Sequence, residues 1–213
     1  MAQSVLIIAD SGTGKSTAIR DLNPDETFII NIANKPLPFK GWKKNYTLIS
    51  KDNPKGNLAS ASSAAGIMKA INHVDQKCPT IKTLVVDDWQ YMSSFEYFDR
   101  ANEKGYDKFT QIAANLALVA KAPKDLRDDL TVIFLTHSED STDINGNRKI
   151  KAKTIGKMID NTLTLEGLFS IVLFGKVNKN DDGELSYGFE TQNNGENTCK
   201  SPQGMFEDFF IPN

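Results

Sequence analysis

Short apolar runs, each rich in β-branched residues, recur along the first two thirds of the chain. Strands are expected at residues 5–8, 27–32, 83–88 and 131–137, with a further short one at residues 46–49. The first run lacks the period-2 alternation of a half-buried strand. It therefore predicts a strand that is buried on both faces of a parallel sheet.

Between these runs, apolar side chains recur at helical spacing. Helices are expected at residues 17–22, 58–74, 93–102 and 107–120. Ser93 and Glu96 lie three residues apart and form a capping box that predicts the start of the third helix. This alternation of strands and helices is typical of a doubly wound α/β sheet.

The last third of the chain has a different pattern. Residues 168–177 and 185–191 are predicted strands, and Asp182-Gly183 between them is a strong hairpin-turn signal. We therefore predict an α/β fold in which a mostly parallel sheet, flanked by helices, is completed by a C-terminal antiparallel extension. The length of 213 residues favours a single domain over residues 1–213.

A loop of small residues follows the first strand. It fits the phosphate-binding pattern G-x-x-x-x-G-K-[ST], except that Ala9 stands in place of the first glycine. In such a loop, backbone N–H groups surround the phosphates of a nucleoside triphosphate, the lysine reaches the β- and γ-phosphates, and the hydroxyl binds Mg²⁺. The helix at residues 17–22 would point its positive end at the anion. The predicted nucleotide-binding residues are Ser11, Gly12, Thr13, Gly14, Lys15, Ser16 and Thr17.

An acidic pair ends the predicted strand at residues 83–88. Asp87 is the predicted Mg²⁺ carboxylate, together with Ser16, because the carboxyl ends of neighbouring strands meet at the ligand-binding edge of such a sheet. Asp88 has two open interpretations. It orients or deprotonates the water that attacks the γ-phosphate, or it is a solvated or helix-capping residue.

Thr136 and His137 place a polar pair at the end of the predicted strand at residues 131–137. His137 would contact the γ-phosphate and report its presence to the loop beyond, whereas the alternative is a structural histidine. The candidate catalytic residues within these motifs are therefore Lys15, Asp88 and His137.

Bulk properties restrict the class of protein only partly. The chain is 39% hydrophobic with a formal net charge of −2, so it has no global signature of nucleic-acid binding. The phosphate loop begins within about ten residues of Met1, so we expect no signal peptide and a cytoplasmic protein without a membrane span. Cys78 and Cys199 lie far apart and outside any C-x-x-C pair, which argues against a metal site or a disulfide framework.

A local excess of basic side chains occurs at residues 146–159, where there is no acidic residue. These side chains are Arg148, Lys149, Lys151, Lys153 and Lys157. Flexible cations of this kind contact phosphate backbones without reading sequence, although solvated loops also collect lysines. We predict DNA contacts from Arg148, Lys149, Lys151 and Lys153. This loop offers no aromatic side chain for base stacking.

Several segments together resemble the short RecA-like ATPases encoded by phages, in particular the Sak-type group associated with single-strand annealing recombination. They are the stretches ADSGTGKST, TLVVDDWQYM, FLTHSE, KTIGKMIDNTL and YGFETQNNGENTCKSPQGMF. The likeness covers nearly the whole chain. Its specific part is the order of the later segments, because many ATPases share the phosphate motifs.

The resemblance implies a RecA-like P-loop NTPase core that binds ATP and Mg²⁺ at the residues named above. It also implies single-stranded DNA as a partner, and assembly into a ring or filament with ATP between subunits. A neighbouring subunit would supply a cation to the γ-phosphate, a role for Lys157 or Lys176. A single-strand-binding protein is a further candidate partner, and the place of action would be the cytoplasm of the infected cell.

One departure from this family concerns hydrolysis. RecA-like recombinases place a catalytic glutamate just beyond the second strand, whereas this chain has Asn31 and Asn34 there. Hydrolysis is therefore slow, or Asp88 substitutes for the glutamate.

The favoured function is an ATPase that binds single-stranded DNA and assists strand annealing or exchange, and two other classes stay open. One is a small-molecule phosphotransferase such as a nucleotide kinase, an enzyme class that usually surrounds the transferred phosphoryl group with arginines. The other is a protein whose assembly is switched by ATP. The scarcity of arginine counts against the kinase, since the chain has only Arg20, Arg100, Arg127 and Arg148.

Overall fold

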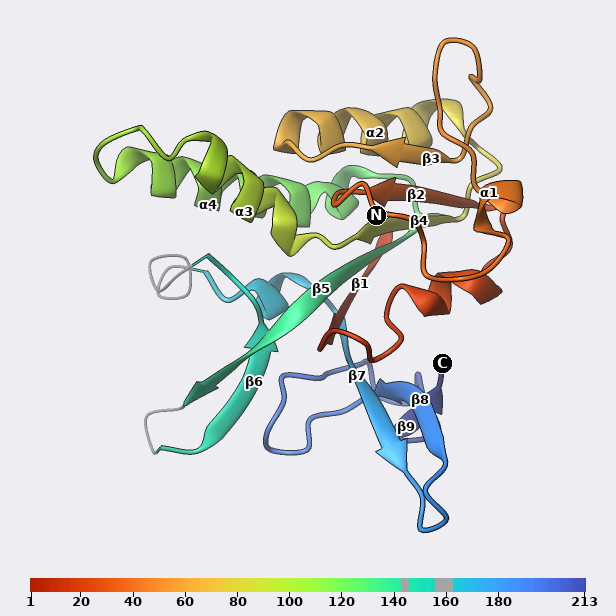
Figure 1. The fold of residues 1–213 in the computed structure, drawn as a ribbon, viewed down its shortest axis with the longest axis vertical. Coiled ribbons are helices and arrows are strands. Elements are labelled where there is room, and N and C mark those ends of the chain that lie inside the picture. The colour runs from red at the N-terminus through yellow and green to blue at the C-terminus, as the bar shows by residue number, and fades with distance from the viewer. Residues whose placement is uncertain (143–145, 156–162) are drawn as a thin grey trace.

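The computed structural model describes residues 1–142, 146–155 and 163–213. The strands are β1 (Gln3–Ala9), β2 (Thr27–Asn31), β3 (Leu58–Ser60), β4 (Thr83–Asp87), β5 (Thr131–Thr142), β6 (Arg148–Ala152), β7 (Ile171–Lys179), β8 (Leu185–Glu190) and β9 (Phe210–Pro212). They form a mixed sheet in the order β3-β2-β4-β5-β1-β7-β8-β9, and β6 pairs with β5 outside this order (Figure 1).

Helices cover both faces of this sheet. They are α1 (Trp42–Asn45), α2 (Ala64–Lys77), α3 (Gln90–Asp99) and α4 (Asp107–Lys121), with the 3₁₀ helices η1 (Thr17–Asp21), η2 (Ala122–Asp125) and η3 (Leu165–Leu168). The pairs from β3 to β7 are parallel, whereas β8 and β9 join in antiparallel fashion. The predicted α/β fold class, with its C-terminal antiparallel extension, is confirmed.

The central strands are buried on both faces, as the apolar run of β1 predicts. Leu6 and Ile8 pack into a core with α2 and α4 on one face of the sheet. Val5 and Ile7 belong to a second core on the other face, together with η1 and apolar side chains of residues 37–46. Both faces of β1 are thus fixed by packing, which holds the loop after Ala9 at a defined position. No helix of the described ranges combines the length and apolar character needed to cross a membrane.

The helix predicted over residues 58–74 is wrong at its start. Residues 58–60 form β3 beside β2, and α2 begins at Ala64. The Ser63 side chain accepts a hydrogen bond from the backbone N–H of Gly66 at 3.2 Å and caps α2. The apolar residues of β3 belong to a strand pattern, and a serine cap separates them from the helix.

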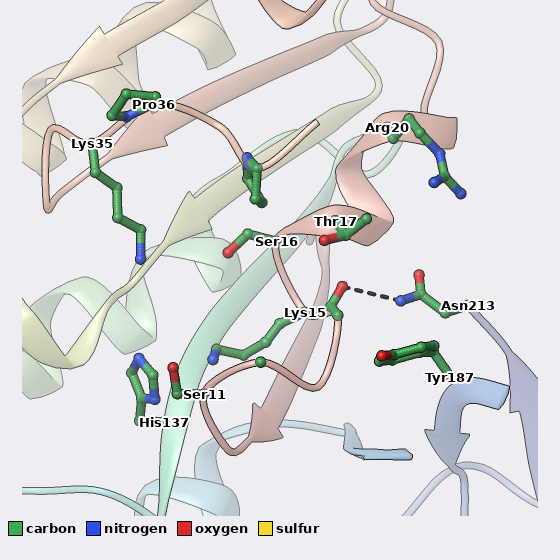
Figure 2. A pocket seen from close by; sticks show the side chains of 13 residues that line it. Ser11, Lys15, Ser16, Thr17, Arg20, Lys35, Pro36, His137, Tyr187 and Asn213 are labelled. Atoms are coloured by element: carbon green, nitrogen blue, oxygen red, sulfur yellow. Dashed lines mark hydrogen bonds between the residues drawn. The ribbon is translucent and has the colours of Figure 1, made fainter. Parts of the chain in front are cut away.

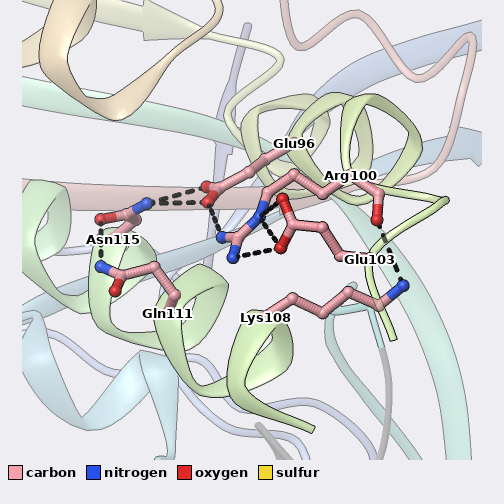
Figure 3. A network of polar contacts seen from close by, with 6 residues as sticks. All are labelled: Glu96, Arg100, Glu103, Lys108, Gln111 and Asn115. Atoms are coloured by element: carbon pink, nitrogen blue, oxygen red, sulfur yellow. Dashed lines mark hydrogen bonds and ion pairs between the residues drawn. The ribbon is translucent and has the colours of Figure 1, made fainter. Parts of the chain in front are cut away.

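The predicted capping box of Ser93 and Glu96 is also wrong. Helix α3 begins at Gln90, directly after β4, so Ser93 lies buried inside the helix. Glu96 accepts hydrogen bonds from Arg100 and from Asn115 of α4, each at 2.9 Å (Figure 3). The carboxylate therefore joins two helices rather than capping one. The early helix start follows from Trp89, whose buried ring contacts Phe134 and Phe169.

The predicted strand at residues 46–49 is reduced to an isolated bridge between Leu48 and Leu58, and it follows the short helix α1. A larger difference concerns β5, which runs to Thr142 rather than to His137. Its second half pairs with β6, so residues 148–152 of the predicted basic loop form a strand. We call this two-stranded projection, residues 138–142 and 148–152, the ribbon.

Candidate functional site

A cleft of about 620 Å³ opens at the carboxyl end of β1, beside the middle of β5 and the segment that follows β2 (Figure 2). Most of the predicted phosphate loop lines it, namely Ser11, Gly12, Gly14, Lys15, Ser16 and Thr17. The other walls come from Lys35 and Pro36 after β2, from His137 on β5, and from Tyr187 and Asn213 near the C-terminal strands. The loop identified from sequence is therefore one wall of a concave site.

The loop is closed by contacts to its own carbonyl groups. The Thr13 hydroxyl donates to the Asp10 carbonyl at 2.8 Å, and the Lys15 ammonium donates to the same oxygen at 3.4 Å. Gly12 and Gly14 have φ angles of 83° and 92°, which other residues adopt only with strain. This geometry accounts for the two glycines of the motif.

Alanine at the first motif position is accommodated by the neighbouring strand. Ala9 of β1 lies opposite Gly175 of β7, and a Cβ on Gly175 would stand 2.7 Å from the Ala9 Cβ. That separation is shorter than any normal carbon contact, so the methyl group of Ala9 occupies space that Gly175 leaves free. The departure from the motif does not disturb the loop.

The helix predicted after the loop is shorter and tighter than expected. The segment forms only the five-residue 3₁₀ helix η1, with one α-type bond from the Ala18 N–H to the Gly14 carbonyl at 3.0 Å. Asn23-Pro24 follows, and the residue before a proline is disfavoured in helical conformation. A helix this short adds little dipole, so the anion would be held chiefly by loop N–H groups and Lys15.

Ser16 and Asp87 meet as predicted. The Ser16 hydroxyl donates to Asp87 Oδ1 at 2.8 Å, although β1 and β4 are not neighbours, because β5 lies between them. Burial and the charge of Asp88 raise the pKa of Asp87 to about 6, and its buried Oδ2 has no hydrogen-bond partner in the described structure.

These residues fit Mg²⁺. A buried carboxylate oxygen without a partner, beside a serine hydroxyl, is the donor set that Mg²⁺ uses when it also binds nucleotide phosphates. Within the described residues no group of three or more His, Cys, Asp or Glu side chains forms a separate metal site. Ser16 and Asp87 would hold the ion, which would neutralise charge on the phosphates.

Asp88 is buried and paired with a lysine, which rules out the interpretation as a solvated residue. Its carboxylate forms an ion pair with Lys35 and lies 3.6 Å from His137 Nε2. Burial acts to raise the pKa of Asp88, but the proximity of His137 and Lys35 outweighs it and lowers that pKa. Its backbone is also unusual, with φ at 58°. Such strained residues concentrate at functional sites.

His137 is held at the cleft by two backbone contacts. Its N–H donates to Gln90 Oε1 at 3.2 Å, and its carbonyl accepts from the Lys153 N–H at 2.8 Å. Thr136, the other member of the predicted polar pair, is buried. The histidine therefore connects Asp88 to the start of α3 and to the chain that leaves the ribbon.

Two basic side chains of the ribbon pair with carboxylates of β5, which lie outside the basic segment of the sequence. Arg148 binds Asp140 at 2.8 Å and Lys151 binds Glu139 at 3.1 Å, while Lys149 contacts the Gly195 carbonyl. Lys153 is exposed. The basic segment contains no acidic residue of its own, but two of its cations pair with carboxylates of β5.

Lys157 and Lys176 are the two residues predicted to supply a cation to the nucleotide of a neighbouring subunit. Lys157 lies outside the described residues. Lys176 forms an ion pair with Glu190 of the same chain at 2.7 Å, and Asn194 and Asn197 also donate to that glutamate. In this chain Lys176 is thus paired with Glu190, and its role toward a neighbouring subunit stays a prediction.

Several cleft residues were missed by sequence reasoning, among them Lys35, Tyr187 and Asn213. Lys35 follows β2 at the ligand-binding edge of the sheet, and the rule that ligands bind beyond the carboxyl ends of strands indicates its place. Tyr187 and Asn213 had no local signal. Asn213 Nδ2 donates to the Gly14 carbonyl at 3.0 Å, a contact across 199 positions (Figure 2).

Comparison with known proteins agrees with this geometry. A search of curated proteins finds no match to the chain. The family model described as AAA domain matches residues 1–203, which include the phosphate loop, Asp87, Asp88 and the ribbon. Since this match spans nearly the whole chain, the protein belongs to the AAA domain family of P-loop ATPases.

Proposed function

We propose that this protein is an ATPase whose hydrolysis is stimulated by single-stranded DNA, and that it assists strand annealing or exchange in phage recombination. The observation that carries the proposal is the course of β5, which borders the cleft at His137 and continues without a break into the ribbon. A ligand on the ribbon would therefore act on the same strand that touches Asp88.

A second contact joins the ribbon to the cleft. The Ser138 hydroxyl donates a hydrogen bond to the Asp10 carboxylate, and Asp10 accepts from Lys15 through its carbonyl. A shift of β5 would therefore reach both sides of the nucleotide, through Asp10 on the loop and through His137 on Asp88. This arrangement supports coupling between DNA binding and hydrolysis.

The roles of the cleft residues follow from their positions. Lys15 would bind the β- and γ-phosphates, and Ser16 and Asp87 would hold Mg²⁺, which would supply positive charge to the phosphates. Water attacks the γ-phosphorus as the bond to the bridging oxygen breaks, and Asp88 accepts the water proton. The products are ADP and inorganic phosphate.

DNA would bind the ribbon through phosphate contacts from Arg148, Lys149, Lys151 and Lys153. Since Glu139 and Asp140 already pair with two of these cations, a DNA phosphate must displace a carboxylate to make the same contact. We infer weak, salt-sensitive binding from each molecule. Assembly into a ring or filament, and help from a single-strand-binding protein, would raise the overall affinity by adding sites.

The test is the ATP hydrolysis rate of the purified protein with and without single-stranded DNA, with Lys15→Ala as the blank. Alanine at both Lys149 and Lys153 should remove the stimulation, whereas Lys44→Ala, an exposed lysine on α1, should leave it intact. Hydrolysis that needs Lys15 but is indifferent to DNA would contradict the proposal.

A second candidate is a protein whose assembly is switched by ATP with little hydrolysis. Asn31 ends β2, and the recombinases that this chain resembles carry a catalytic glutamate just beyond that strand. The asparagine at this place and the pairing of Asp88 with Lys35 both favour this second function. Mass measurement with ATP, with ADP and without nucleotide tests this function. An unchanged assembly state in all three conditions would rule it out.

A further inference from the structure

Lys35 reaches from the segment after β2 to the carboxylate of Asp88. The ammonium group forms an ion pair with Asp88 Oδ2, and the Lys35 side chain is 48% exposed while that of Asp88 is 1% exposed. One end of this pair is thus fixed inside the protein and the other lies at the cleft surface. A charged ligand in the cleft can reach the lysine but not the aspartate.

The backbone of Lys35 is held by its neighbours, whereas its side chain is half-exposed. Asn31 Nδ2 donates to the Lys35 carbonyl at 2.6 Å, and Asn34 before it has φ at 51°. Pro36 after it is restricted in φ by its ring. A lysine has a flexible four-carbon stem, so its ammonium can move between partners without moving this backbone.

The cleft also holds a second ammonium group beside the first. Lys15 and Lys35 line the same cavity, and Lys15 contacts a neutral carbonyl rather than a carboxylate. Two ammonium groups that line one cavity repel each other. A phosphate group between them, such as the γ-phosphate of a nucleotide next to Lys15, would relieve this repulsion.

We propose that Lys35 is the cation that the γ-phosphate recruits from within the same subunit. Without nucleotide it pairs with Asp88, and a bound triphosphate draws it away from that carboxylate. Asp88 is then released from Lys35 and becomes available to the attacking water only when a γ-phosphate lies in the cleft. This inference rests on the proposed ATP hydrolysis, but not on DNA binding.

The alternative is a structural ion pair that stays closed with nucleotide bound. The two cases differ in what Lys35 contributes to affinity. A cation that moves to the γ-phosphate strengthens binding of a triphosphate and leaves that of a diphosphate unchanged. A permanent ion pair affects both nucleotides alike.

The experiment measures the affinities of ADP and of a non-hydrolysable ATP analogue, each with Mg²⁺ and without DNA, by titration calorimetry. In Lys35→Met the analogue should bind about tenfold more weakly, while ADP should stay within about twofold of the unchanged protein. Lys35→Arg should keep most of the preference for the triphosphate. Lys44→Met on α1 is the matched control, because it removes an exposed lysine outside the cleft.

Removing Lys35 alone leaves the buried Asp88 charge unpaired and can weaken folding. The second comparison is therefore Asp88→Asn against the double variant Asp88→Asn with Lys35→Met, in which no charge is left unpaired. The triphosphate preference should again fall about tenfold in the double variant. Equal effects on both nucleotides, or none, would overturn the role of Lys35, whereas DNA-insensitive hydrolysis with this preference intact would overturn only the proposed DNA function.

Discussion

The cleft and the ribbon both carry clustered lysines, but they balance that charge differently. In the cleft, Lys15 is buried and contacts a backbone carbonyl, and Lys35 has its only ion pair in the described structure with Asp88. In the ribbon, Arg148 and Lys151 each face an exposed or half-buried carboxylate on the opposite strand. In the cleft, Lys15 therefore has no carboxylate partner among the described residues, whereas two of the ribbon cations are neutralised by carboxylates of the opposite strand.

This difference indicates how the two regions would bind phosphate. A buried cation gains much from an anionic ligand, because water screens the interaction weakly. An exposed pair gains little, because the ligand must compete with a carboxylate and with salt. Single substitutions in the cleft should therefore change phosphate binding strongly, and single substitutions in the ribbon should change it only weakly.

The largest effect is expected for Lys15→Ala. The variant loses the buried cation that contacts the phosphates in both ground and transition states, so kcat/KM for ATP hydrolysis should fall at least about a thousandfold. Steady-state assays of phosphate release measure this. The circular dichroism spectrum should be unchanged, and a variant that still hydrolyses ATP at the normal rate would refute the role of the loop.

Asp88→Asn should be the next in size. The amide cannot accept the water proton, so kcat should fall about a hundredfold, while nucleotide binding persists. Asp52→Asn, at an exposed position outside the cleft, is the control. Full turnover in Asp88→Asn would show that another group activates the water.

Gly175→Ala tests the packing beneath the phosphate loop. The new methyl group would meet the Ala9 Cβ at 2.7 Å, and we expect the free energy of unfolding to fall by about 2 kcal/mol. Urea denaturation measures this, with Gly167→Ala as the control, since a Cβ there would have its nearest neighbour at 3.9 Å. Ala9→Gly in the same chain should restore most of the loss, and no restoration would mean that the two positions do not interact.

The smallest effect is expected in the ribbon. Asp140→Asn removes the carboxylate that occupies Arg148, so the affinity for a single-stranded oligonucleotide should rise about twofold to threefold at low salt. Fluorescence anisotropy measures this, with Asp52→Asn as the control. Unchanged affinity across a salt series would indicate that Arg148 does not meet DNA.

Sequence reasoning found the parts of the site that depend on local pattern. The phosphate loop follows β1, Asp87 ends β4, and His137 lies in β5 directly after its buried apolar residues, because these apolar runs are unambiguous in the sequence. The contact between Ser16 and Asp87 also follows, since strands of a parallel sheet end at one edge.

Other features depend on contacts that no local pattern contains. Lys35 belongs to no motif, and its meaning comes from Asp88, 53 positions later. The ribbon was missed because its strands are rich in charged and polar residues, so hydrophobic periodicity does not detect them. The same lack of signal hides Asn213, which contacts the phosphate loop across nearly the whole chain.

The central claim is that the cleft and the ribbon are coupled through β5. The most direct test is the affinity for a fluorescent single-stranded oligonucleotide without nucleotide, with ADP, and with a non-hydrolysable ATP analogue. Because coupling is reciprocal, DNA that promotes the ATP-bound state must itself bind that state more tightly. We predict an affinity at least about threefold higher with the triphosphate analogue than without nucleotide, and no such gain in Lys15→Ala. Equal affinities in all three conditions would contradict the coupling.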